Sequence, residues 1–331
     1  MSKHSIVILT IAVALFGNRS PANAQRIRAA SGGLSTIHSL LWVVYDQKLA
    51  KKYGIDLEYI AIENGTVGMQ ALLANEAQFL FSTSSLAVNA NLRGSDIAVI
   101  AGGLNFIPDK LIVRPEIKQP EDLAGKRLAI SRFGSSSETS AKLTLEKVGV
   151  KPESVSLIQL GGVSTRQAAL MAGQVQATIL SDPQATAAVN AGMKLWVDLS
   201  ESKWNLPRFC FNCFMVKRSF LESQRETASN FLKAVIEGLY LLKKDKPLGV
   251  RLIKKYLRLS DEAAAIGYDF YIAKHGEGVL SLPERKGMEF VISEVAKTNP
   301  AAAIATPESL RLLEPSILDE IKKSGFVERA K

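Results

Sequence analysis

Short apolar runs alternate with amphipathic segments from Ile27 to Trp196, and this alternation constrains the fold more than any other feature of the chain. The runs that read as strands are 27–30, 57–60, 78–81, 97–101, 110–113, 127–131, 156–160, 177–180 and 195–199. Segments with helical spacing of apolar residues lie between them, at 37–52, 67–74, 136–148 and 165–172. Strands that alternate with helices form βαβ crossovers, so the sequence predicts an α/β fold with largely parallel sheets.

The end of the chain has a different pattern. After Phe220 the sequence is almost entirely helical, and Phe231, Val235, Leu239 and Leu242 have the spacing of a buried helix face. Earlier in the chain, residues 66–83 and 164–181 are similar, and each predicts a capped helix, a tight turn and an apolar strand. Either two lobes are built on related βαβ units, or the likeness is chance.

Residues 1–24 have the three parts of a secretory signal peptide: a basic start, an apolar run from Ile6 to Gly17, and small residues ending at Ala24. The apolar run is too short to span a bilayer, although an N-terminal membrane anchor is the alternative. We therefore expect an exported, periplasmic protein that is cleaved near Ala24 and begins at Gln25.

The charge does not point to a polyanionic partner. The chain has 41 Lys and Arg against 32 Asp and Glu, a formal net charge of +9. Cleavage of the leader removes two of these charges, Lys3 and Arg19, which leaves +7. The remaining basic residues are spread over predicted helix faces, so we expect no nucleic-acid partner.

Small polar residues follow most of the predicted strands, at 31–36, 63–66, 82–85, 132–136, 161–165 and 181–183. In an open α/β sheet, ligands bind at the carboxyl ends of the strands, where helix N-termini offer free N–H groups. We expect a binding crevice there, with Ser35, Thr36, Gly134, Ser135 and Ser136 as its main anchors. The alternative is that each hydroxyl only caps its own helix.

Groups for covalent chemistry are scarce. The mature chain has two histidines, His38 and His275, and lacks HExxH, GxSxG, P-loop and GxGxxG motifs. His38 either reaches the crevice or lies on a helix surface. Cys210 and Cys213 fall in an apolar stretch that reads as a strand, where residues i and i+3 point to opposite faces. We expect two buried thiols there, with a strained disulfide as the alternative in an oxidising compartment. We expect no metal site and no cofactor.

Residues 102–137, with support from 41–60, 68–85 and 217–239, resemble the solute-binding proteins of ABC importers for nitrate, sulfonates, taurine and thiamine-pyrimidine compounds. The resemblance implies a two-lobed periplasmic-binding-protein fold of the second type, with two mixed, mostly parallel sheets, flanking helices and a helical C-terminal region. It places lobe one at 25–112 plus 214–331 and lobe two at 113–213. The interlobe crossings would lie near 110–115 and 209–217.

The same resemblance implies a set of ligand contacts. The polar ones are Ser35, Thr36, Asn64, Gly65, Thr83, Ser84, Gly134, Ser135, Ser136, Thr165 and Asp182, to which the chain's own pattern adds His38. Apolar walls would come from Trp42, Phe133 and Phe209. Because Asp182 would repel an anion, a zwitterion, a cationic ring or a neutral polar molecule is as plausible a ligand as a sulfonate.

The leading hypothesis is a monomeric, non-enzymatic receptor that captures a small polar or anionic organic molecule between two lobes and delivers it to an ABC permease. One alternative is an enzyme related to thiamine-pyrimidine biosynthesis, with His38, Cys210 and Cys213 as active groups. A second alternative is a sensing subunit that passes its ligand to a signalling partner.

Overall fold

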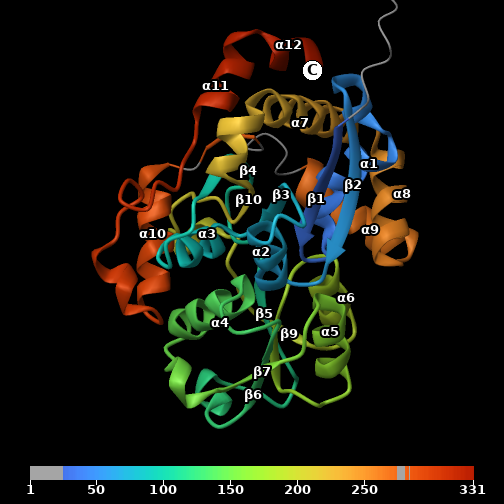
Figure 1. The fold of residues 1–331 in the computed structure, drawn as a ribbon. Coiled ribbons are helices and arrows are strands. Elements are labelled where there is room, and N and C mark those ends of the chain that lie inside the picture. The colour runs from blue at the N-terminus through green and yellow to red at the C-terminus, as the bar shows by residue number, and fades with distance from the viewer. Residues whose placement is uncertain (1–24, 274–279, 283) are drawn as a thin grey trace, which may run out of the picture.

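The computed structural model describes residues 25–273, 280–282 and 284–331 and contains two five-stranded sheets (Figure 1). The predicted signal peptide and His275 lie outside the described residues. The first sheet has the order β2-β1-β3-β10-β4 and the second β7-β6-β8-β5-β9. The strands are β1 Gln25–Gly32, β2 Ile55–Ile62, β3 Phe79–Ser82, β4 Ile97–Leu104, β5 Lys110–Val113, β6 Arg127–Ile130, β7 Ser156–Gln159, β8 Ala177–Leu180, β9 Lys194–Asp198 and β10 Asn212–Lys217.

Each sheet is mixed, which confirms the predicted two-lobed fold class. In the first sheet β1 runs parallel to β2 and β3, whereas β10 is antiparallel to both of its neighbours, β3 and β4. In the second sheet β6 runs parallel to β7 and β8, whereas β5 is antiparallel to β8 and β9. The antiparallel strand is in each case the first strand after the chain has crossed from the other sheet.

Sheet membership corrects both predicted crossings. All of β5 pairs with β8 and β9, so residues 110–112 lie in the second sheet and the first crossing is 105–109. Asn212 and Cys213 pair with β4 and therefore lie in the first sheet, which places the second crossing at 199–211. An apolar run predicts a strand, but it does not say which sheet the strand joins, and this is why the boundaries moved.

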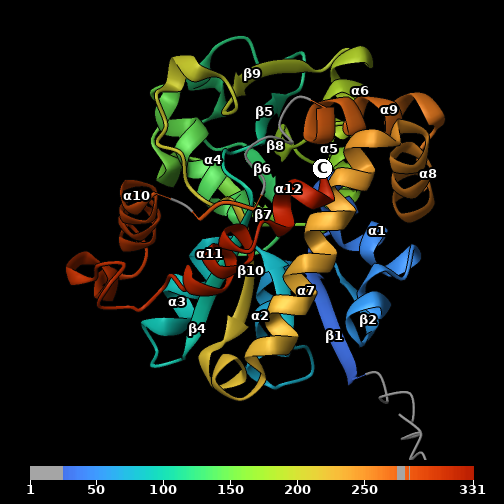
Figure 2. The same cartoon turned by 90° about the horizontal axis from the view of Figure 1, so that it is seen from above.

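Helices cover the sheets of both lobes (Figures 1 and 2). The α-helices are α1 Ser39–Asp46, α2 Gly65–Leu73, α3 Ser84–Asn91, α4 Ser136–Lys147, α5 Val163–Met171, α6 Gln184–Asn190, α7 Arg218–Lys244, α8 Lys246–Leu257, α9 Asp261–Tyr268, α10 Arg285–Ala296, α11 Ser316–Lys323 and α12 Phe326–Ala330. Short 3-10 helices span Thr36–His38, Leu49–Tyr53, Pro120–Leu123, Pro152–Ser154, Ser202–Trp204 and Pro300–Ile304, and a π-helical turn spans Asp269–Ala273. No helix in the described part of the chain is long and apolar enough to cross a membrane.

The predicted helix 37–52 is broken into three pieces. Its α-helical part, α1, ends at Asp46, and Lys48 then has a left-handed backbone with φ of 53°. The break turns the following 3-10 helix so that Leu49 packs toward Gly238 of α7. The apolar spacing continues through the break, which is why the sequence did not reveal it.

Helix α7 packs its apolar face on the first sheet, over which it lies in Figure 2. Its Phe231 stacks on Phe79 of β3 with ring centroids 3.9 Å apart. Val235, Leu239 and Leu242 are also buried, as their spacing predicted. Burial of each such side chain contributes about 1.5–3 kcal/mol to folding.

Gly287 of α10 packs directly against the second crossing, and it provides a test of this packing. A Cβ atom there would overlap the carbonyl oxygen of Arg208 and lie 2.9 Å from Cα of Phe209, both backbone atoms that cannot rotate away. We therefore expect Gly287→Ala to destabilise the protein by about 1–3 kcal/mol, although alanine is the better helix former. The measurement is urea unfolding. Lys286→Ala, an exposed change in the same helix, should stay within about 0.5 kcal/mol of wild type. Equal stability of Gly287→Ala and wild type would contradict the packing.

Candidate ligand-binding site

A cavity lies between the two sheets, and residues of both lobes line it. The space within it that water-sized molecules can occupy is about 100 Å³. The first lobe contributes residues that follow β1, β2 and β3, and the second lobe contributes residues that follow β6, β7 and β8. The cavity therefore lies at the carboxyl ends of parallel strands, where the polar junctions predicted a crevice.

The two antiparallel strands, β5 and β10, bring their amino ends to the cavity. Lys110 begins β5 and pairs with Leu180, the last residue of β8, so the residue before it, Asp109, lies at the cavity. In the same way Asn212 begins β10 beside the end of β4, and it lines the cavity together with Phe211. A search of strand carboxyl ends alone cannot find these residues, because it assumes that every strand runs the same way.

The structure brings about half of the predicted contacts together at the cavity. Those that line it are Ser35, His38, Asn64, Gly65, Thr83, Ser135 and Ser136. Those that do not are Thr36, Trp42, Ser84, Phe133, Gly134, Thr165, Asp182 and Phe209. Ligand contact by the first group stays a prediction. The positions of the second group away from the cavity have structural reasons, which differ among its members.

The three predicted aromatic walls lie elsewhere. Trp42 is fully buried in the first lobe, where its indole N–H donates to the Tyr59 hydroxyl at 2.8 Å and its ring stacks on Tyr256. Phe133 is 53% exposed on the second lobe. Phe209 packs beside Phe290 in a separate apolar pocket. The aromatic rings at the cavity instead include those of Phe211, two residues further along the chain, and Tyr271.

Four of the predicted polar contacts form hydrogen bonds within the protein or lie away from the cavity. The Ser84 hydroxyl donates to the Cys210 carbonyl at 2.7 Å, which ties α3 to the second crossing. The N–H of Gly134 donates to the carboxylate of Glu138. Thr36 is buried against Gly267 of α9, and Thr165 is exposed on α5. Local packing, which the sequence does not specify, decides the direction of each of these groups.

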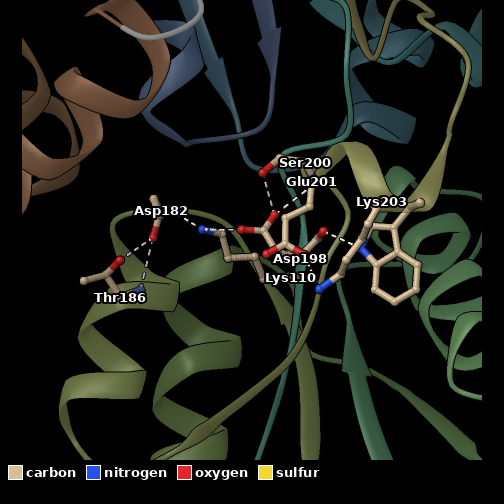
Figure 3. A network of polar contacts seen from close by, with 8 residues as sticks. Lys110, Asp182, Thr186, Asp198, Ser200, Glu201 and Lys203 are labelled. Atoms are coloured by element: carbon tan, nitrogen blue, oxygen red, sulfur yellow. Dashed lines mark hydrogen bonds and ion pairs between the residues drawn. The ribbon is translucent and has the colours of Figure 1, made fainter.

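Asp182 belongs to a buried ion network instead of facing the cavity (Figure 3). Its carboxylate lies 2.6 Å from the ammonium of Lys110, which also lies 3.0 Å from the carboxylate of Asp198. Thr186 donates to the other Asp182 oxygen from its backbone N–H and its hydroxyl. Burial lowers the pKa of Lys110, but the hydrogen bonds and charges of both carboxylates outweigh it and the net pKa is raised. Asp182 pairs with Lys110 and does not line the cavity, so it is not in direct contact with the cavity as the sequence predicted.

Two buried charged residues that were not among the predicted contacts line the cavity. Arg166, in the first turn of α5, directly follows the predicted Thr165, so that junction already carried the signal for it. Its guanidinium donates to the carbonyls of Gly161 and Ile179, which holds it in place. Burial lowers its pKa to about 10, against the opposing charge of Asp109, so it stays a cation at neutral pH.

Asp109 is the other unpredicted charge. One of its oxygens accepts a hydrogen bond from the Ser140 hydroxyl at 2.6 Å. Burial raises its pKa to about 6, and this effect exceeds the opposing effects of Ser140 and Arg166. Asp109 is therefore mostly ionised at pH 7. The sequence did not indicate that Asp109 lies at the cavity, because it did not show in which direction the following strand runs.

His38 is held as a neutral imidazole. Its Nδ1 atom lies 3.2 Å from the backbone nitrogen of Ser35. Burial lowers its pKa to about 4, against a smaller opposing effect of the Ser35 backbone. The Nε2 atom is buried and has no hydrogen-bond partner among the residues that the structure describes. His38 thus brings a polar but uncharged group to the cavity wall.

The polar residues at the strand ends cap helices and also line the cavity. Asn64 caps α2 by accepting from the Val67 N–H at 3.0 Å, as the capping alternative predicts. Around the start of α4, the hydroxyls of Ser131, Ser135 and Ser137 lie 2.9 Å from one another. This cluster lines the cavity and orders the α4 N-terminus, whose positive dipole end favours an acceptor or an anion.

Cys210 and Cys213 are joined in a disulfide, which corrects the prediction of two buried thiols. The prediction assumed an extended strand over both residues. The strand begins only at Asn212, and its pairing with β4 shifts register between Asn212 and Cys213, so the two Cα atoms lie 5.8 Å apart. The described residues contain no group of three or more His, Cys, Asp or Glu that could hold a metal ion.

Comparisons with known proteins agree with this architecture. The model of the NMT1/THI5-like family matches residues 50–246. The taurine-binding periplasmic protein of Escherichia coli (strain K12) is 26% identical over 195 residues, which are 58% of this chain and 59% of that protein. The chain thus spans about three-fifths of the length of that relative.

Solved structures of binding proteins share the fold. The periplasmic nitrate-binding protein NrtA from Synechocystis PCC 6803 has a TM-score of 0.73 at 11% identity, over 91% of this chain and 89% of that one. The periplasmic aliphatic sulphonate binding protein SsuA from Escherichia coli has a TM-score of 0.69 at 18% identity, over 89% and 93%. At such low identity these likenesses establish the fold alone.

The burial of neutral His38 predicts acid sensitivity. Its folded pKa of about 4 lies below the ordinary value of 6.5, so the unfolded chain takes up a proton that the folded protein refuses. Its contribution to stability is complete above pH 6.5 and is lost as the pH falls toward 4, a loss on the order of 3 kcal/mol.

Urea unfolding at pH 7, 5 and 4 tests this expectation in wild type and His38→Gln. The free energy of unfolding should fall more steeply with acid in wild type, by about 3 kcal/mol over the range. Asp109 has a raised pKa and acts in the opposite direction, but it does so in both proteins and cancels in the comparison. Parallel pH profiles would contradict a buried neutral His38.

Proposed function

Because the chain belongs to the NMT1/THI5-like family, we propose that it is a receptor that captures a small polar or anionic organic molecule between its lobes and delivers it to an ABC permease. The observation that carries this proposal is the polar cavity between the two sheets, to which both lobes contribute side chains. The names of the relatives, which include taurine-, nitrate- and sulphonate-binding proteins, support it.

Binding is proposed to depend on the two crossings, 105–109 and 199–211. Both segments connect the lobes beside the cavity, so rotation about them would open and close it. A bound molecule that contacts both lobes would stabilise the closed form, because only that form gives it all of its contacts. The closed form would then present one surface to the permease.

The proposal includes no covalent step. The cysteines of the enzyme alternative are bonded to each other and offer no thiolate, which is the reactive form of the residue. His38 remains near the cavity, but with a pKa of about 4 it is a poor base at neutral pH. Export, cleavage near Ala24, a periplasmic location and a monomeric state are further parts of the proposal.

A binding screen tests the receptor function. The protein lacking residues 1–24 is titrated with nitrate, alkanesulfonates, taurine, aminopyrimidines and short amino acids by calorimetry and thermal unfolding. At 100 times its dissociation constant, a ligand should add about 2.7 kcal/mol of stability. It should also be recovered chemically unchanged.

Matched variants locate the binding. Ser136→Trp would fill the cavity and should abolish binding while the protein stays folded. Ser156→Trp is its control, because Ser156 is exposed at the amino end of β7, away from the cavity. The receptor proposal fails if no compound binds, if the bound compound is recovered altered, or if both variants bind like wild type.

A further inference from the structure

Among the residues that the structure describes, the charged ones that line the cavity are two acids and one base, an unexpected balance for a site that takes an anion. They are Glu63 at the exposed edge, Asp109 and Arg166. Asp109 and Arg166 are only 9% and 7% exposed, so little water reaches either group. His38 is neutral and cannot offset the second acid.

The ion network next to the cavity does not offset this excess of acidic residues. There the single ammonium of Lys110 is shared by two carboxylates, Asp182 and Asp198 (Figure 3). Lys110 therefore has no positive charge left over for Asp109, its neighbour in the chain. A ligand bearing only negative charge would meet an excess of carboxylates on this side.

Asp109 and Arg166 keep unused hydrogen-bonding capacity toward the cavity. The two residues form no ion pair within 4 Å in the described part of the chain. Arg166 uses three of its N–H groups on backbone carbonyls, and a guanidinium has five. Asp109 accepts from Ser140 through one oxygen, whereas a carboxylate can accept about four hydrogen bonds.

We infer that the ligand is a compact zwitterion, whose protonated amine pairs with Asp109 and whose acidic group binds Arg166 and the N-terminus of α4. This inference rests on the proposed receptor function and narrows its ligand class. Such a molecule satisfies both buried charges at once. A simple anion leaves Asp109 unpaired beside like charge, and a simple cation leaves Arg166 without an anionic ligand group. Asp109 would be the residue that determines specificity for the amine.

Ligand pairs that differ only at the amine provide the test. Taurine is compared with 2-hydroxyethanesulfonate and β-alanine with 3-hydroxypropanoate, so that a neutral hydroxyl replaces the ammonium at nearly constant size. In wild type, at least one amine should bind ten times or more tighter than its hydroxyl partner. An equal affinity within both pairs would overturn the inference.

Asp109→Asn identifies the residue responsible. The amide keeps an acceptor for Ser140 but removes the charge, so affinity for the amine should fall at least tenfold and the preference over the hydroxyl partner should disappear. Glu76→Gln removes the same charge from an exposed position outside the cavity lining and should keep the full preference. A preference that survives in Asp109→Asn would overturn the role of Asp109.

The outcomes separate this inference from the receptor proposal. If nitrate, alkanesulfonates or aminopyrimidines bind and neither amine does, the receptor stands and the zwitterion is excluded. If nothing binds, the receptor proposal itself fails. If Asp109→Asn does not fold, the wild-type comparison of amine with hydroxyl still decides the ligand class.

Discussion

The direction of two strands governs the organisation of the molecule. Each time the chain crosses between lobes, it enters the new sheet through a strand, β5 or β10, that is antiparallel to both of its neighbours. The parallel strands bring their carboxyl ends to the interlobe cavity, whereas these two bring their amino ends. The crossings themselves thus become part of the cavity wall, and Asp109 and Phe211 line it from the segments that join the lobes.

Ion pairs and hydrogen bonds hold the charged side chains of the second lobe in place beside the cavity. Lys110 holds Asp182 and Asp198 at the ends of β8 and β9, and Arg166 is fixed by carbonyls of its own lobe. Removing one partner from such a network leaves an unpaired charge in a poorly solvated place, which is costly. The network also extends to the first lobe, because the Lys110 ammonium lies 5.0 Å from the centre of the Phe270 ring. The next residue, Tyr271, lines the cavity, so the network, the cavity and the first lobe are in contact at one place.

The candidate site was predictable as a region more than as a list of residues. Hydroxyls and glycines at strand ends located it, and Ser35, Thr83 and Ser135 do line the cavity. Trp42 and Asp182 do not line the cavity, and each is buried with partners in its own lobe. A hydrophobic or acidic residue near a strand end looks the same in the sequence whether it faces a ligand or a neighbour. Only the packing around it distinguishes the two cases.

By itself, the sequence determined the α/β class, the position of nearly every strand, the helical C-terminal region and the buried face of α7. These features follow from the spacing of apolar residues, which is local information. The tertiary structure alone decided the sheet to which β5 and β10 belong, the disulfide between Cys210 and Cys213, and the charges that line the cavity. Each of these depends on contacts between distant segments. The apolar pattern of a strand specifies neither the strand with which it pairs nor the direction in which it runs. The chemistry of the cavity is therefore a property of the fold, because the residues that set its charge meet only after the chain has crossed between lobes.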